Sequence, residues 1–237
     1  MITSIVEWLL DPASWRGYGG IGARLGEHLL YSGIIMAIAV AIAVPLGLYI
    51  GHTGRASWAV TLANSLRAVP SLGLLFAMTL LVGPLFTSEL AFVIPSIVVL
   101  VLLAVPPVLS GAYAGVASVD PAARDAAHGV GMSPGQVLAR VEVPCALPLL
   151  LSGIRSATLQ VIATATIAAY VGLGGLGRYL IDGLASGDYV RTAGGAVLVA
   201  VLALAIDGVL ALVERGVVSP GLTGKDVGDT GVVASAT

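Results

Sequence analysis

Residues 125–144 read DAAHGVGMSPGQVLARVEVP and bring acidic, basic, glycine and proline residues together in an otherwise apolar chain. Of the 237 residues, 57% are hydrophobic and 10% are charged, whereas soluble domains carry roughly 25% charged residues. The mean hydropathy of +1.01 agrees with this composition. We therefore expect an all-α membrane protein in which this stretch forms a polar loop between spans.

Five segments are long and apolar enough to cross the hydrocarbon core, which requires about 20 residues in a helix. These spans are expected at residues 29–50, 58–82, 91–116, 146–171 and 192–213. Together they predict a transmembrane domain over residues 27–216. Residues 1–26 contain two tryptophans and a tyrosine, which suits an interfacial segment. Residues 217–237 are rich in Gly, Ser and Thr and predict a loose tail.

Prolines within the expected spans indicate interrupted helices, because each removes a backbone hydrogen bond and bends or breaks the helix. They are Pro45, Pro70, Pro95, Pro106 and Pro107. Membrane helices tolerate such breaks where neighbouring helices or a wet cavity satisfy the freed carbonyl groups, which is typical of transporters. The alternative is that proline is simply more frequent in membrane helices than in soluble ones.

Three charged residues fall inside the expected spans at comparable depth, namely Arg67, Arg155 and Asp207. A lone charge in the bilayer is costly, so we expect Asp207 to pair with Arg155 or Arg67. We interpret this as a structural ion pair that holds helices in register. A proton or ion relay is the less favoured alternative.

Several other functions are disfavoured by the sequence. Cys145 is the only cysteine, the three histidines lack metal-ligand spacing, and no basic run indicates nucleic acid. No serine or cysteine has an evident histidine base in a matching span, which disfavours a membrane-embedded hydrolase. We expect no enzyme activity and no cofactor. Residues 172–177, GLGGLG, fit a dinucleotide-binding pattern but lack its strand and acidic residue. We interpret them as the closely packed end of the fourth span.

The polar loop is expected to form two short helices. Asp120 followed by proline predicts a capped helix start, and Gly129 and Gly131 predict its end. A second start follows at Ser133, where Ser-Pro-x-Gln forms a capping box. We expect this second helix to end at Pro144, where the chain is redirected into the fourth span. The result is a rigid polar elbow that suits contact with another protein, although an ordinary interfacial loop is an alternative.

The elbow, residues 118–144, resembles the EAA loop of permeases in ABC importers. That pattern is an acidic residue and two alanines, then a glycine, two aliphatic residues and a proline at fixed spacing. This chain supplies it with Asp125, Ala126, Ala127, Gly131, Val141, Val143 and Pro144. Asp125 stands where glutamate is usual, which leaves a shorter side chain for contact with a partner.

Two further stretches, AVPSLGLLF around Pro70 and AYVGLGGLGRYLIDG around Gly174, extend the resemblance to the osmoprotectant branch over residues 24–213. The resemblance implies a type I importer permease fold whose elbow docks, in the cytoplasm, on a separate ATPase subunit. It also implies two ATP-binding subunits, an extracytoplasmic solute-binding protein and a second permease subunit, identical or homologous. The chain itself has no G-x-x-x-x-G-K-[ST] sequence for ATP.

The expected solute is glycine betaine, choline or carnitine. The alternatives are another small solute such as an amino acid, or an ion-driven secondary transporter or membrane scaffold. We expect Pro70 and Ser71 to line the path. Tyr113 and Tyr170 could contact a passing cation, although packing and interfacial anchoring also explain these tyrosines.

The expected location is the cell membrane. A cytoplasmic elbow and five spans place the N-terminus outside and the C-terminus in the cytoplasm. The arginine and lysine bias between the two sides is small, so this orientation follows from the resemblance.

Overall fold

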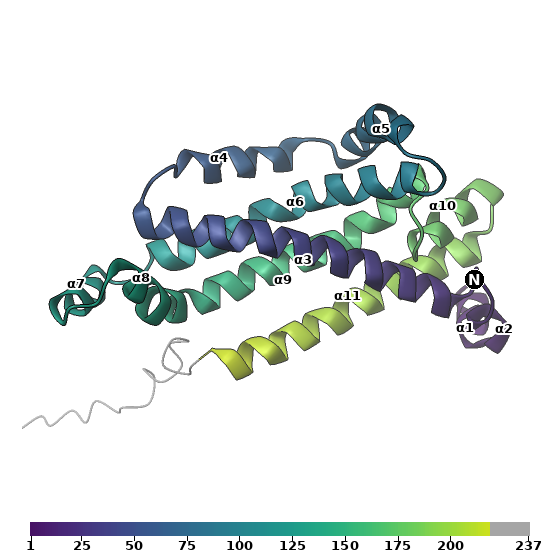
Figure 1. Cartoon of the computed structure of the whole chain (residues 1–237). Coiled ribbons are helices and arrows are strands. Elements are labelled where there is room, and N and C mark those ends of the chain that lie inside the picture. The colour runs from purple at the N-terminus through teal and green to yellow at the C-terminus, as the bar shows by residue number, and fades with distance from the viewer. Residues whose placement is uncertain (219–237) are drawn as a thin grey trace, which may run out of the picture.

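In the computed structural model, the described residues 1–218 form a bundle of helices that contains no strand within that range (Figure 1). Four helical stretches are long and apolar enough to cross a membrane: α3 (Ile21–Thr53), α6 (Leu90–Ala117), the stretch Pro134–Val171 that contains α9, and α11 (Tyr189–Val217). A bent pair, α4 (Trp58–Ser65) and α5 (Ser71–Val82), supplies a fifth crossing. The prediction of an all-α membrane protein with about five spans is confirmed.

The second span, expected at residues 58–82, is interrupted at Pro70, as the proline pattern predicted. The 3-10 turn Leu66–Ala68 ends α4, and α5 then leaves at an angle of 94°. Pro70 causes the break, because it has no N–H and its ring forces the preceding residue out of the helical region. Val69 accordingly adopts φ −75° and ψ 129°. The prolines inside α3 and α6 do not break those helices. The presence of a proline in a span therefore does not by itself predict a break.

α6 lies at the centre of the bundle and packs against α3 and α9 (α9 is Val143–Ala168) (Figure 1). Its contact with α9 is made by glycines. A Cβ atom on Gly111 would lie 2.6 Å from the Leu149 carbonyl oxygen, and one on Gly153 would lie 2.7 Å from the Pro107 carbonyl oxygen. The two backbones therefore touch without a layer of side chains between them, as is common for helices that pack in lipid.

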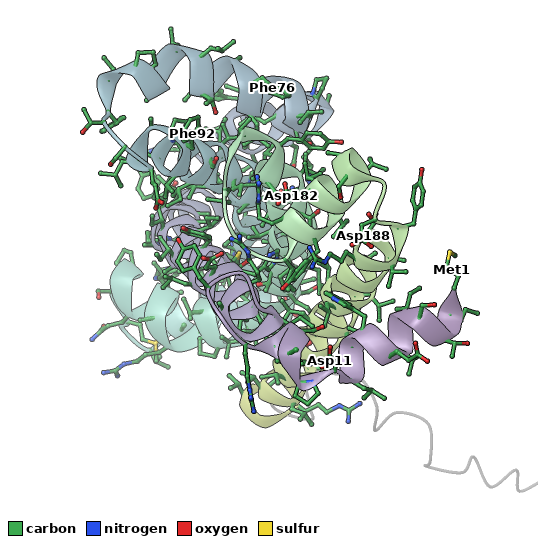
Figure 2. The ribbon with its side chains drawn as sticks, turned by 90° about the vertical axis from the view of Figure 1, so that its right-hand side faces the viewer. Met1, Asp11, Phe76, Phe92, Asp182 and Asp188 are labelled. Atoms are coloured by element: carbon green, nitrogen blue, oxygen red, sulfur yellow. The ribbon has the colours of Figure 1, made fainter. Side chains whose placement is uncertain are left out.

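The end of the bundle opposite the elbow is formed by α1 (Ile2–Leu10), α2 (Pro12–Trp15) and α10 (Gly177–Ser186) (Figure 1). Figure 2 views this end, where α1 projects towards Met1 and Asp182 lies on α10. The Trp8 and Tyr179 rings meet edge to face with their centroids 5.2 Å apart. Burial raises the pKa of the Tyr179 phenol, so the hydroxyl stays protonated and donates to the Gly19 carbonyl over 2.8 Å.

The predicted domain boundaries at residues 26 and 216 remain predictions. α3 begins at Ile21, inside the segment expected to be interfacial, and α11 ends at Val217. Of the predicted tail, residues 217–237, the part from residue 219 lies outside the described residues.

Candidate functional site

The first helix of the elbow is α7 (Pro121–Gly129), and both of its ends are closed by local hydrogen bonds. The Asp120 side chain accepts a hydrogen bond from the Ala122 amide over 2.9 Å. At the other end the Met132 amide donates to the Ala127 carbonyl over 3.1 Å, around Gly131, whose φ is +85°. This closure requires a left-handed residue, which explains glycine at position 131.

The second half of the elbow differs from the expected separate helix. Ser133 and Gln136 form the predicted capping box at the start of α8 (Pro134–Val137). The chain then continues through a π-helical turn, Leu138–Glu142, directly into α9. The widened turn lies just before Pro144, which has no N–H for the regular hydrogen-bond ladder. The chain is therefore not redirected at Pro144, and the elbow ends as the start of a long membrane helix.

The motif residues divide between the surface and the interior of the elbow. Asp125 and Ala126 are exposed, whereas Ala127 is buried. Val130, beside Gly131 at the tip, has 76% of its surface exposed. Val141 is half-buried and Pro144 is exposed. A small residue and a carboxylate thus face outward next to an exposed apolar side chain.

A buried carboxylate joins the elbow to two transmembrane helices. Glu142 is 1% exposed, and its Oε2 lies 2.6 Å from Nδ1 of His52 in the last turn of α3. Its Oε1 lies 2.9 Å from Nε of Arg124 on α7, a contact of charges in which the N–H is not aligned for a hydrogen bond. The Arg124 guanidinium also donates to the Val116 carbonyl in the last turn of α6. We call His52, Arg124 and Glu142 the elbow cluster.

No local sequence pattern predicts the elbow cluster. Arg124 and Glu142 flank the motif, but His52 is 90 residues away from Glu142. Only Glu142 is fully buried, because the side chains of His52 and Arg124 are 20% and 26% exposed. A buried carboxylate depends on such partners, since a charge without them is costly to bury. The elbow cluster therefore links the elbow to the last turns of α3 and α6.

Asp207 lies with Arg155 and not with Arg67. Arg155 Nε is 2.5 Å from Asp207 Oδ1, and Nη2 is 2.6 Å from Oδ2, which joins α9 to α11 by two parallel hydrogen bonds. Glu214 Oε2 lies 3.7 Å from Arg155 Nη1. A planar guanidinium paired with a carboxylate in this way fixes the relative rotation of the two helices.

Arg67 lies at the break between α4 and α5 and makes no ion pair within residues 1–218. It lines a hollow of about 260 Å³ together with Ser110, Ser152 and Ser156. At 1.5 Å per residue, Arg67 is roughly 14 Å from the start of α4, which is close to the middle of a bilayer core. If α4 begins at the membrane surface, this polar hollow therefore lies at mid-membrane depth.

The four residues expected along the path do not form one site. Pro70 and Ser71 lie at the break before α5, and Tyr113 packs against the buried cluster that includes Ile50 and Val60. Tyr170 instead lines a separate hollow towards the end of the bundle opposite the elbow.

Comparison with known proteins identifies the family. Residues 33–219 match the family described as the binding-protein-dependent transport system inner membrane component. The chain belongs to this family. It is a membrane-integral transport permease of the ABC importer type, and the family is not a catalytic one.

The permease is similar over most of its length to osmoprotectant permeases. It is 36% identical over 202 residues to the glycine betaine/carnitine/choline transport system permease protein OpuCB of Bacillus subtilis, covering 85% of this chain and 90% of that protein. It is 34% identical to the choline transport system permease protein OpuBB of the same species, with 83% and 88% covered. It is 31% identical to the osmoprotectant import permease protein OsmW of Salmonella typhimurium, with 86% and 93% covered.

The permease also shares its fold with solved transporters. The inward-facing MetNI methionine ABC transporter gives a TM-score of 0.71 at 20% identity, covering 84% of the permease and 96% of that chain. An amino acid ABC transporter with histidines gives 0.64 at 22% identity, with 83% and 93% covered. The expected type I importer permease fold is confirmed.

Proposed function

We propose that the permease forms the translocation path for an osmoprotectant such as glycine betaine, choline or carnitine. The observation that carries this proposal is the similarity to osmoprotectant permeases over more than four-fifths of both chains. In this proposal the energy comes from two separate ATP-binding subunits, and an extracytoplasmic binding protein delivers the solute. A second permease subunit, identical or homologous, completes the channel.

In this proposal the elbow receives the force of the ATPase. The residues of the elbow that contact the ATPase or hold the elbow in shape are Asp125, Ala126, Ala127, Gly131, Val141 and Pro144. The exposed Asp125 and Ala126 support a surface that a partner can approach closely, because neither side chain is large. Movement of the elbow would then be passed to α3 and α6 through the elbow cluster, and to α9 through the continuous helix. Repositioning of these helices alternates access to the path.

The proposed orientation places the elbow in the cytoplasm, the N-terminus outside and the C-terminus in the cytoplasm. The arrangement of the bundle supports this, because α1 lies at the end opposite the elbow, whereas α11 runs back towards the elbow end (Figure 1). The long apolar helices fit a cell membrane. The serine-lined hollow beside Arg67 supports a path near the Pro70 break.

The test is reconstitution of the permease with its ATPase and binding protein in proteoliposomes. Glycine betaine, choline or carnitine should stimulate ATP hydrolysis and should accumulate inside the vesicles only when ATP is present. Stimulation by an amino acid and by none of these three solutes would favour the second candidate, an amino acid permease. The methionine transporter, which shares the fold, is the reason to test this candidate. Uptake driven by an ion gradient without ATP would indicate a secondary transporter.

A further inference from the structure

Three aromatic side chains from distant parts of the chain line one hollow. Phe76 comes from α5, Phe92 from the first turn of α6, and Tyr170 from the 3-10 turn Ala169–Val171 that follows α9. Phe76 and Phe92 lie close to each other in the view of the end opposite the elbow (Figure 2). The hollow has a volume of about 390 Å³, which is within the range of pockets that hold small molecules.

The three rings are only partly used in packing. Phe76, Phe92 and Tyr170 are 44%, 46% and 48% exposed. The first glycine of GLGGLG lets the backbone approach them, because Gly172 has a φ of +98° and a Cβ atom there would lie 3.2 Å from Phe92 Cγ. The hollow thus offers aromatic surface at a place where glycine, and no larger residue, fits.

The polar groups of the hollow add no unpaired positive charge that would repel a cation. Arg178 lines it, but its Nη2 lies 2.7 Å from Asp182 Oδ1, so the positive charge is already balanced. Its Nη1 also donates to the Ala169 carbonyl over 3.3 Å. The Thr79 hydroxyl oxygen is buried and finds no hydrogen-bond partner among the described residues. The lining therefore combines three aromatic rings, an arginine paired with a carboxylate, and one hydroxyl group without a hydrogen-bond partner among the described residues.

We propose that this aromatic hollow receives the quaternary ammonium group of the solute before the solute enters the path between the helices. This inference rests on the proposed function. An alkylated ammonium ion has no N–H to donate, so it is recognised by the electrostatic attraction of ring faces and by burial of its methyl groups. Half-exposed rings give weak binding, which suits a receiving site from which the solute moves on. The hollow is extracytoplasmic if the elbow is cytoplasmic.

The test measures binding to the whole transporter in lipid nanodiscs without its binding protein. Saturation-transfer NMR compares choline, tetramethylammonium and 3,3-dimethylbutan-1-ol, the uncharged carbon isostere of choline. The variants are Phe92→Leu and Tyr170→Leu, which remove a ring and keep apolar bulk. Tyr170→Phe keeps the ring. Phe86→Leu is the matched control, because Phe86 lies near the same end but does not line the hollow.

Either leucine variant in the hollow should weaken binding of choline and tetramethylammonium by about two- to thirtyfold, whereas Tyr170→Phe and Phe86→Leu should bind as the unmodified protein does. The isostere should bind more weakly than choline. Equal binding of the isostere and choline, as for a groove filled by a lipid chain, would overturn the inference. Unchanged binding in both leucine variants, or an equal loss in Phe86→Leu, would also overturn it.

The result separates this inference from the proposed function. Ring-dependent binding of tetramethylammonium in a transporter that imports only an amino acid would leave the site in place and remove the osmoprotectant proposal. Import of glycine betaine, choline or carnitine without ring-dependent binding would support the osmoprotectant proposal and remove the aromatic receiving site.

Discussion

Glu142 Oε2 lies 2.6 Å from Nδ1 of His52, and this contact joins the base of the elbow to the last turn of α3. Glu142 is also the carboxylate that faces Arg124 of α7. One buried side chain thus connects the part of the permease that would meet an ATPase to a helix that crosses the membrane.

Replacing Glu142 with alanine should both destabilise the permease and weaken coupling. The change leaves the partly exposed Arg124 without its carboxylate and removes the contact with His52, which should cost about 1–3 kcal/mol. We expect a lower unfolding temperature and fewer solute molecules moved per ATP hydrolysed. Glu89→Gln, an exposed carboxylate before α6, is the control. An unchanged transport-to-hydrolysis ratio in Glu142→Ala would contradict a role of the elbow cluster in force transfer.

Gly131 and Gly135 offer a matched pair within the elbow. Neither would place a Cβ atom against a neighbour, but Gly131 has a φ of +85° and Gly135 does not have a left-handed backbone. Gly131→Ala should therefore cost about 1–2 kcal/mol and disturb the closure of α7. We expect ATP hydrolysis to continue with reduced uptake in Gly131→Ala and both to stay normal in Gly135→Ala. Equal behaviour of the two variants would show that the turn at Gly131 is not needed for coupling.

Asp207→Asn should lower the thermal stability of the purified permease, because Arg155 loses its bidentate partner and keeps only the more distant Glu214. Adding Arg155→Gln should restore part of the stability, whereas adding Arg67→Gln should not. The measurement is the unfolding temperature of the single and double variants. Rescue by Arg67→Gln alone would mean that Asp207 changes partner in the membrane.

Cys145 tests the orientation, because it is the only thiol in the chain and is exposed beside the elbow. A membrane-impermeant maleimide should label it in inverted vesicles and leave it unlabelled in intact cells. A Cys145→Ser variant provides the unlabelled control. Labelling from the outside only would place the elbow, and with it the whole permease, the other way round.

The sequence predicted the apolar spans and the ends of α7 because these depend on local features. Uncharged runs mark α6 and the part of α3 after residue 28, and Asp120 and Gly131 close α7 through hydrogen bonds within a few residues. Pro70 breaks its helix but Pro95 does not. α6 buries residues along its length, whereas α5 buries only Leu75, so packing holds one helix together and leaves the other free to turn.

The contacts between distant helices could not be predicted from the neighbouring residues in the sequence. The pairing of His52 with Glu142, the choice of Arg155 over Arg67, and the meeting of Phe76, Phe92 and Tyr170 all depend on how distant helices lie side by side. A single sequence gives the chemical character of each residue. It does not give the rotation of one helix about another, which decides these contacts.

The glycine contact between α6 and α9 limits where the permease can change shape. With Gly111 and Gly153 pressed against the opposing backbone, the two helices have no side chains between them at this crossing that could rearrange. The two helices should behave as a rigid unit in both access states. The moving boundary of the transport cycle would then be sought at the right-angled turn before α5, because the bidentate pair of Arg155 and Asp207 holds α11 to α9.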